Sequence, residues 1–224
     1  WTWGSNNHGQ LGQGNVIYIS SPVQVGALTD WSQVAGFAKN FAAIKTDGTL
    51  WTWGRNNKGQ LGLGTPTAQN ESSPVQVGAL TNWATVSVGQ EHVIATKTDG
   101  TLWFFGGDGN GKGGQGTNQV HASSPVQVGA LTDWSTAVAH QRFTAATKTN
   151  GTLWTWGDDM HGGLGNDQDA GTYGRSSPVQ VGALTDWSQV AAASSDSAAI
   201  KTDGTLWTWG SNNHGQLGQG NVIY

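Results

Sequence analysis

Cysteine is absent from this chain of 224 residues, and charged residues are scarce. Without cysteine, neither a disulfide framework nor a thiolate metal site can form. Only 11% of the residues are charged and the formal net charge is -4, so the basic stripe that nucleic-acid binding requires is missing. No run approaches the roughly twenty apolar residues that span a bilayer. We therefore expect neither a nucleic-acid partner nor membrane insertion.

Glycine and tryptophan are abundant instead, with 35 and 13 residues respectively. Glycine supplies the backbone freedom of tight turns, and the large aromatic side chain of tryptophan favours strands. This combination predicts many short strands rather than helices.

The sequence repeats with a period of 50 to 53 residues. One anchor is a WTWG-like string, whose copies begin at Trp1, Trp51, Trp103, Trp154 and Trp207. The other is the string SSPVQVGALT, which begins at Ser20, Ser72, Ser123 and Ser176. A period of this length is typical of propeller blades or solenoid coils. We interpret residues 1–224 as a single array of about four repeat units, with a partial unit from Trp207.

Each unit reads as four strands, which we place at 31–35, 41–46, 49–54 and 72–77 in one repeat. Asp47-Gly48 lies between the second and third strands, and it predicts a two-residue type I′ turn with positive φ at both positions. Pro74 lacks an N–H to donate, so the fourth strand is expected at the sheet edge.

Trp51 and Trp53 alternate with Leu50 and Thr52 along the third strand, so both indoles share one face of the sheet. We expect this face to pack against small residues of a neighbouring blade, such as Ala42 and Ala43.

The run from WSQVA through SAAIKTDGTLWTWG to a GQLG turn and a proline-containing strand resembles the RCC1-like repeat. Its Trp-Gly pair and GQLG turn are present at 3–4 with 9–12, 53–54 with 59–62, and 209–210 with 215–218. Two units depart from it, with Phe105-Gly106 in the third and a GGLG turn at 162–165 in the fourth.

The resemblance implies an all-β fold, a β-propeller of four-stranded antiparallel blades. It does not imply one function, because the family includes both a chromatin-bound nucleotide exchange factor and a secreted inhibitor of β-lactamases. Family propellers usually have seven blades, so with about four units the closure of a ring within one chain stays open.

Residues 1–18 recur unchanged as 207–224. Residues 187–206 could complete an N-terminal half-blade, as propellers often do. The two identical segments would then compete for one place. Either one copy is displaced, it is exchanged with another chain in head-to-tail self-association, or the array continues.

Apparent catalytic and cofactor motifs are rejected because the same positions in the other repeats are ordinary blade loops. We therefore predict a non-enzymatic protein without cofactor or metal. Gly106, Gly111 and Lys112 match a phosphate-binding loop, but Gly113 replaces the required Ser or Thr and no helix is expected to follow. Asp167 and Asp169 have a calcium-loop spacing without the twelfth-position Glu, so calcium binding there stays open. Three further candidate ligands precede them, namely Asp158, Asp159 and His161.

The corners between first and second strands vary in charge and size while the strands hardly change. Such variation on a fixed scaffold favours a binding face for a protein or glycan. The candidate residues are Phe37, Lys39, Asn40, Gln90, Glu91, His92, His140, Gln141, Arg142 and Asp196.

Two alternatives to a binding module stay open. One is a structural or assembly segment of a larger secreted, cell-surface or virion protein, and the other is an engineered or excised propeller fragment. The chain begins inside a repeat, with no signal peptide pattern before it. We therefore expect a processed or partial product with an extracellular, cell-surface or virion location.

Overall fold

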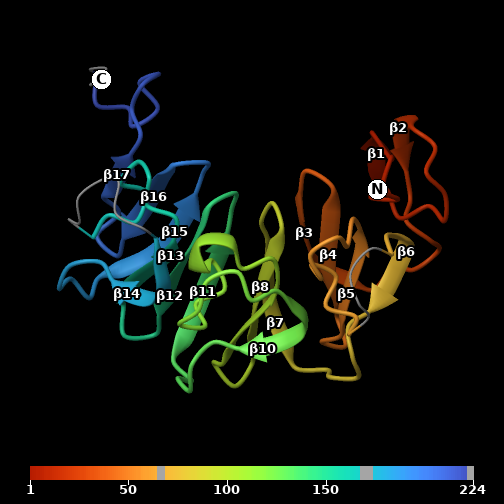
Figure 1. Cartoon of the computed structure of the whole chain (residues 1–224), viewed down its shortest axis with the longest axis horizontal. Coiled ribbons are helices and arrows are strands. Elements are labelled where there is room, and N and C mark those ends of the chain that lie inside the picture. Colours follow the sequence, from red (N-terminus) through yellow and green to blue (C-terminus); the bar gives the residue numbers. More distant parts are fainter. Residues whose placement is uncertain (65–68, 167–173, 221–224) are drawn as a thin grey trace.

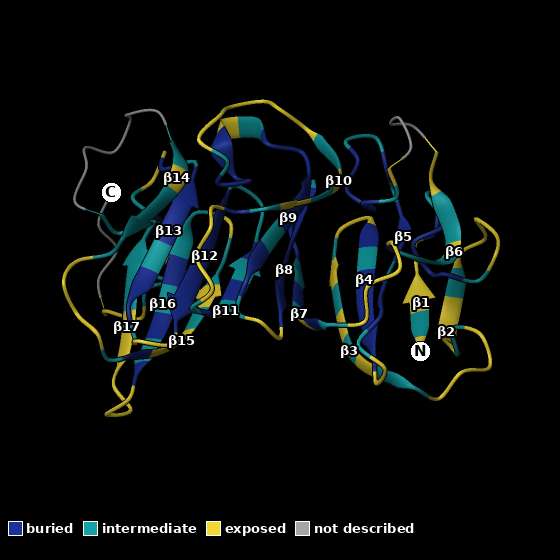
Figure 2. Ribbon diagram, turned by 90° about the horizontal axis from the view of Figure 1, so that it is seen from below, coloured by how far each residue is buried: buried dark blue, intermediate teal, exposed yellow. Residues whose placement is uncertain are grey.

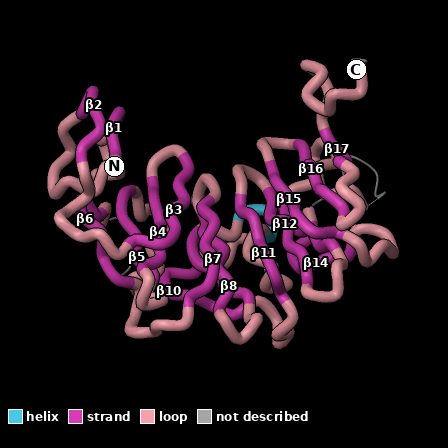
Figure 3. The backbone as a smooth tube through the Cα atoms, turned by 180° about the vertical axis from the view of Figure 1, so that it is seen from behind, coloured by secondary structure: helices cyan, strands magenta, loops and turns pink. Residues whose placement is uncertain are grey.

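Five separate antiparallel sheets follow one another along the chain in a computed structural model that describes residues 1–64, 69–166 and 174–220. They are arranged as an open arc, with the two termini at its opposite ends (Figures 1 and 3). Each sheet is one blade or part of one. The all-β prediction and the antiparallel four-stranded blade are confirmed.

One complete blade shows how the repeat folds. Its strands are β3 (Trp31–Phe37), β4 (Asn40–Lys45), β5 (Leu50–Gly54) and β6 (Glu71–Gln76), paired in that order. The predicted strands therefore exist, with bounds shifted by a few residues. As the proline predicted, β6 lies at the outer edge, where the missing N–H of Pro74 interrupts no central ladder.

The remaining strands repeat this order. The second complete blade contains β7 (Trp83–Val88), β8 (His92–Lys97), β9 (Leu102–Gly106) and β10 (Ala122–Gln127), with a short 3-10 turn, η1 (Gly109–Gly111). The third contains β11 (Trp134–Ala139), β12 (Phe143–Lys148), β13 (Leu153–Gly157) and β14 (Arg175–Gln180). The terminal sheets contain β1 (Thr2–Gly4) and β2 (Ile19–Val23), and β15 (Trp187–Ala192), β16 (Asp196–Lys201) and β17 (Leu206–Gly210).

The turn between β4 and β5 differs from the predicted type I′ turn. Gly48 N donates to Lys45 O at 2.9 Å and Lys45 N to Thr49 O at 3.0 Å, which defines a three-residue loop. Gly48 has a positive φ of 77°, but Asp47 does not. The Asp47 carboxylate instead accepts bonds from the Thr49 N–H and hydroxyl, at 2.9 and 2.7 Å. The turn is a type I turn closed by a glycine bulge.

The cores lie between the blades. One buried cluster combines Ala42, Ile44 and Leu50 of one blade with residues of the next, including Val93 and Phe105. Burial is therefore concentrated in the middle strands of the complete blades, whereas β1, β2 and β17 are more exposed (Figure 2). Adjacent sheets stabilise each other, as expected for a repeat array.

A glycine as well as the expected alanine meets the face that carries the large rings, since Ala42 lies in one buried cluster with Phe105, the Trp53 equivalent of the next blade. Trp53 Nε1 donates to Gln10 O of the preceding blade at 2.9 Å. A Cβ built on Gly12 would lie 3.0 Å from the same nitrogen, so only glycine leaves room for the ring. Ala43 instead pairs with Trp51 inside its own sheet.

Every blade with a complete first hairpin holds a lysine between two tryptophans. Lys45 Nζ lies 5.1 and 4.5 Å from the ring centroids of Trp31 and Trp51, and 3.3 Å from Asp30 Oδ2. The same arrangement recurs at Lys148 and Lys201. These cation–π contacts anchor the start of the first strand to the start of the third.

The two ends of the arc do not join. Residues 187–206 do not complete the N-terminal blade, because β17 pairs with β16 in a three-stranded sheet while β1 pairs only with β2. The surface that a neighbouring blade covers elsewhere is open here: Trp3 is 58% exposed and the equivalent Trp53 only 3%. No helix within the described residues is long and apolar enough to cross a membrane.

Candidate binding face

The predicted binding residues lie at the corners that join the first and second strands. The first strands are neighbours along the inside of the arc, since β3 packs on β7, β7 on β11 and β11 on β15. Their corners therefore converge on one face of the molecule, which we call the corner face. It is made of residues 37–40, 89–92, 140–143 and 193–196.

Contacts between corners hold this face together. The Phe37 ring meets the His140 ring edge-on, with centroids 4.7 Å apart, although the complete blade β7–β10 lies between their own blades in the chain. Between them, Gln90 N donates to His140 O at 3.3 Å. A Cβ at Gly89 would lie 2.3 Å from the same carbonyl, so glycine alone permits this approach. Further along, Ser194 Oγ donates to Gln141 Oε1 at 2.6 Å.

The loops after the third strands support the corners from outside. Arg142 Nη1 lies 2.9 Å from Asp158 Oδ2, and Asp158 N donates to Arg142 O at 3.1 Å. Asn110 Nδ2 reaches the same carboxylate oxygen at 3.2 Å. At the first corner, Arg55 N donates to Lys39 O at 2.9 Å. Asp158, Asn110 and Arg55 were missed as part of this face, although their loops also vary between repeats.

Two predicted face residues are buried. His92 is 0% exposed and Asn40 is 1% exposed, so neither can contact a partner. Both begin a second strand and lie between blades. The other eight candidates are exposed or half-buried: Phe37, Lys39, Gln90, Glu91, His140, Gln141, Arg142 and Asp196.

His92 is a structural link between blades. Its Nε2 lies 3.1 Å from Thr144 Oγ1, which in turn donates to Lys112 O at 3.0 Å. Burial, with the nearby Lys112 and His140, holds the pKa of His92 well below its usual value. Burial also lowers the pKa of His140, against the opposing effect of Asp196. Both rings are therefore neutral at pH 7.

The glycine run that matched a phosphate loop forms an ordinary blade turn. Residues 109–111 are a single 3-10 turn with no helix after it, and Lys112 is buried, with its carbonyl accepting a bond from Trp156 Nε1 at 2.9 Å. Within the described residues no group of three His, Asp or Glu could hold a metal ion. Asp167 and Asp169 lie outside the residues that the structure describes.

The sequence matches the regulator of chromosome condensation (RCC1) repeat at residues 1–36, 47–96 and 150–200, and again at 187–216. The chain belongs to the RCC1 repeat family. The matched segments omit 97–149, which contain the divergent third unit, yet that region supplies β9 to β12 of two blades with the same strand order.

A sequence relative supports this assignment, and two solved structures share the fold. The ultraviolet-B receptor UVR8 of Arabidopsis thaliana is 30% identical over 99% of this chain and 51% of its own length. The structure of yeast RCC1 (Prp20) bound to Kap60 is similar, with a TM-score of 0.82, 19% identity, and coverage of 97% of this chain and 53% of that chain. A second Prp20p structure, from Saccharomyces cerevisiae, also has a TM-score of 0.82 with 20% identity, and coverage of 98% of this chain and 55% of that one. The chain thus spans about half the length of these relatives.

Proposed function

We propose that this chain is a non-enzymatic binding module that contacts a protein partner through the corner face. The observation that carries the proposal is the continuity of this face: corners of different blades, unlike in sequence, contact one another directly. A scaffold that repeats its strands and varies its adjoining corners presents a specific surface.

The chemistry of the face supports a protein partner. The Phe37 and His140 rings are central and half-buried, while Lys39 and Gln90 are exposed beside them. An apolar centre with charged and polar surroundings is the usual composition of a protein interface. Among the solved relatives, yeast RCC1 (Prp20) is bound to Kap60 in one structure, and the binding of Prp20p to Gsp1p and histones has been described with another. A glycan partner at this face is the less favoured form of the proposal.

The test compares two sets of residues at opposite ends of the blades, all of them exposed except Gln141, which is half-buried. One variant combines Lys39→Ala, Gln90→Ala and Gln141→Ala, and its control combines Thr46→Ala, Thr98→Ala and Thr149→Ala at the hairpin turns. Quantitative mass spectrometry of proteins retained by each immobilised chain is the measurement. A partner retained by the wild type and the control but lost from the face variant is expected. Equal retention by all three chains contradicts the proposal.

The exposed blade surfaces favour assembly as a second candidate function. Trp3 and Trp207 are 58% and 49% exposed, and in two interior interfaces the equivalents of Trp3, Trp53 and Trp156, donate to the turn of a preceding blade. The turn at 215–218 could receive Trp3 of a second copy in the same way. Such head-to-tail assembly would suit a structural segment of an extracellular or virion protein. Light scattering against concentration tests it: a monomer at every concentration, with Trp3→Ser behaving identically, excludes self-association.

A further inference from the structure

Three equivalent pockets lie between neighbouring blades, away from the corner face. Their volumes are 360, 290 and 500 Å³, in chain order. Each is lined by the same five parts: a Gly-x-Gly turn, a Val-Gly linker, a leucine, a pair of tryptophans and a Ser-Pro step. They lie at the opposite end of the blades from the corners, because their tryptophans begin the first and third strands.

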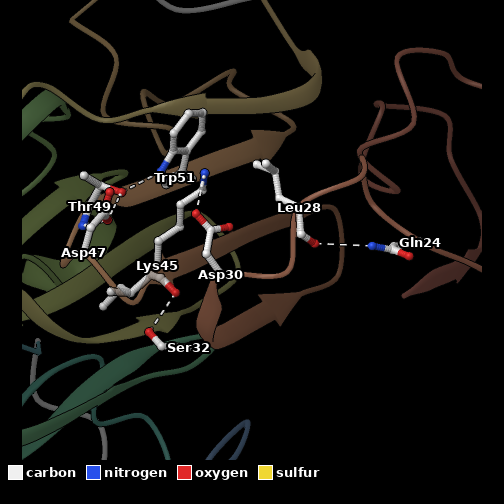
Figure 4. Close-up of polar contacts among 9 residues, drawn as sticks. Gln24, Leu28, Asp30, Ser32, Lys45, Asp47, Thr49 and Trp51 are labelled. Carbon is white, nitrogen blue, oxygen red and sulfur yellow. Dashed lines mark hydrogen bonds and ion pairs between the residues drawn. The ribbon is translucent and has the colours of Figure 1, made fainter.

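The first pocket shows the arrangement in detail. Trp31 and Trp51 meet edge-on, with centroids 6.0 Å apart. Leu28 lines the same pocket from the linker on the side of Trp51 (Figure 4). Trp51 Nε1 is already bonded to Thr49 Oγ1 at 2.8 Å, so this indole offers its ring to a ligand rather than its N–H. Leu28 is 48% exposed, and Leu80 and Leu131 repeat it at 48% and 47%. An exposed apolar side chain kept beside an aromatic pair in every copy indicates an apolar contact surface.

Polar groups without a protein partner face the same pockets. Ser73, Ser124 and Ser177 are exposed and, within the described residues, their hydroxyls make no hydrogen bond. Gln13 and Gln115 each donate to a backbone carbonyl, at 3.1 and 3.2 Å, which leaves their Oε1 atoms as acceptors. The first and third pockets, which we call the outer pockets, therefore each combine an aromatic wall with a serine hydroxyl and the amide oxygen of Gln13 or Gln115.

Charge is absent from the lining. No described Asp, Glu, Lys, Arg or His lines any of the three pockets, and the nearby Lys45 ammonium is already paired with Asp30. A charged ligand would lose its hydration without gaining an opposite charge. Complementarity therefore selects a neutral ligand that has an apolar face and several hydroxyls.

We propose that the three inter-blade pockets bind neutral sugar units of a carbohydrate. A sugar ring presents C–H groups to the tryptophan and leucine side chains and hydroxyls to the serine and glutamine. Most glycoside hydrolases use a pair of carboxylates, and no described carboxylate lines a pocket, so we propose binding without cleavage.

The repetition favours a polysaccharide over a peptide. A proline-rich peptide docks along one continuous aromatic-lined groove. Here the aromatic pairs are confined to separate pockets, one per blade junction, which matches a polymer whose similar units recur along its length. Simultaneous binding of several units raises affinity by effective concentration, by about 10²-fold or more when the spacing allows it.

The middle pocket provides an internal control. Leu63 takes the position of Gln13 and Gln115 there, so this pocket lacks the amide acceptor that those two residues supply; its remaining glutamine, Gln76, corresponds to Gln127 of the third pocket. It is expected to be the weakest of the three. Gln13→Leu and Gln115→Leu would convert the outer pockets to the composition of the middle one without introducing a residue foreign to the fold.

The experiment uses the full chain on an array of neutral glucans, galactans, mannans and N-acetylglucosamine oligomers, followed by titration of tryptophan fluorescence. Ser73→Tyr, Ser124→Tyr and Ser177→Tyr fill the pockets singly and together, and Ser135→Tyr places the same side chain on an exposed position of β11 as control. We expect about a tenfold loss of polymer affinity for each filled outer pocket and no binding when all three are filled. Gln13→Leu with Gln115→Leu should weaken binding at least tenfold with an unchanged melting temperature.

Three results would overturn the proposal: no saccharide bound by the wild type, binding undiminished in the triple tyrosine and the double leucine variants, or saturable binding of a proline-rich peptide in place of the sugars. The proposal does not depend on the corner face. The variant of Lys39, Gln90 and Gln141 should keep full carbohydrate binding, so the two proposals fail independently.

Discussion

The two junctions between complete blades have the same shape, but one contains side-chain hydrogen bonds and the other is apolar. Where β7–β10 meets β11–β14, the carbonyl of Lys112 accepts bonds from Trp156 Nε1 at 2.9 Å and Thr144 Oγ1 at 3.0 Å. Where β3–β6 meets β7–β10, the aligned residues are Phe105 and Val93, and neither can donate a side-chain hydrogen bond. The second-strand residue aligned with His92 is Asn40, whose amide atoms are buried without a partner.

The shape of the two junctions is nevertheless the same. A Cβ at Gly62 would lie 2.8 Å from the Phe105 ring, as a Cβ at Gly114 would from Trp156 Nε1. The apolar junction compensates with a larger buried cluster, in which Val86, Val88 and Val93 contact the preceding blade. Close packing of a large ring on glycine therefore positions the blades, and the polar contacts adjust stability on top of that.

Removing the polar contacts from the bonded junction should have the largest effect. Thr144→Val with Trp156→Phe would remove both hydrogen-bond donors of the Lys112 carbonyl. The same change would remove the Thr144 hydroxyl that is the partner of the buried His92 Nε2. Each unsatisfied buried group costs about 1–3 kcal/mol, so we expect a loss of about 3 kcal/mol in the free energy of unfolding. Urea denaturation measures it. A loss below about 1 kcal/mol would show that apolar packing alone determines both junctions.

A buried aspartate in the divergent blade should give the next largest effect. Asp108 Oδ1 accepts from Gly113 N at 2.7 Å, as Asn6 Oδ1 does from Leu11 N, but Asn6 Nδ2 also donates to two loop carbonyls. Asp108→Asn supplies that donor and should stabilise the chain by about 1–2 kcal/mol at pH 7.

The pH dependence of this variant has a definite sign. Burial raises the pKa of Asp108, so protonation of the folded state is favoured and the wild type gains stability as pH falls through that pKa. The advantage of Asp108→Asn should therefore shrink between pH 7 and pH 4. Unfolding curves at several pH values measure it, and an advantage independent of pH would exclude the buried charge as its cause.

Adding a hydroxyl to the apolar junction should raise the free energy of unfolding, by less than the loss expected at the hydrogen-bonded junction. Val93→Thr places a donor and acceptor at the position from which Thr144 meets His92, next to the unpartnered Asn40 amide. We expect a gain of about 1 kcal/mol. In the background of Asn40→Ala the gain should disappear. Destabilisation in both backgrounds would mean that the new hydroxyl finds no partner and only disturbs the packing.

The sequence predicts the blade well because its rules are local. Pro74, the Asp-Gly turns and the alternation of Trp51 and Trp53 each act within a few residues, and the strand order follows from them. The turn type was wrong because the Asp47 carboxylate bonds to Thr49, which polarity alone does not reveal.

The corner face was predictable only in part. Its residues were found by their variation between repeats, but the contact of Phe37 with His140 depends on how the first strands converge. Asn40 and His92 were placed on this face because they lie at the variable corners. Their side chains instead point between blades, and local sequence carries no signal for that direction.

The smallest effect is expected at the lysine between tryptophans in the divergent blade. Lys97 Nζ lies 3.6 Å from the Trp103 ring centroid, but Asn82 stands where the other blades have Asp30, Asp133 and Asp186. Burial lowers the pKa of Lys97, and Asn82→Asp would raise it by restoring the ion pair. Because the equivalent aspartates are about 40% exposed, we expect only about 0.5 kcal/mol at low salt, declining with salt. Asp133→Asn should remove the ion pair with Lys148 in the blade β11–β14 and lower the free energy of unfolding by a similar amount. Equal stability of both variants and the wild type at low salt would mean that the cation–π contacts alone hold these lysines.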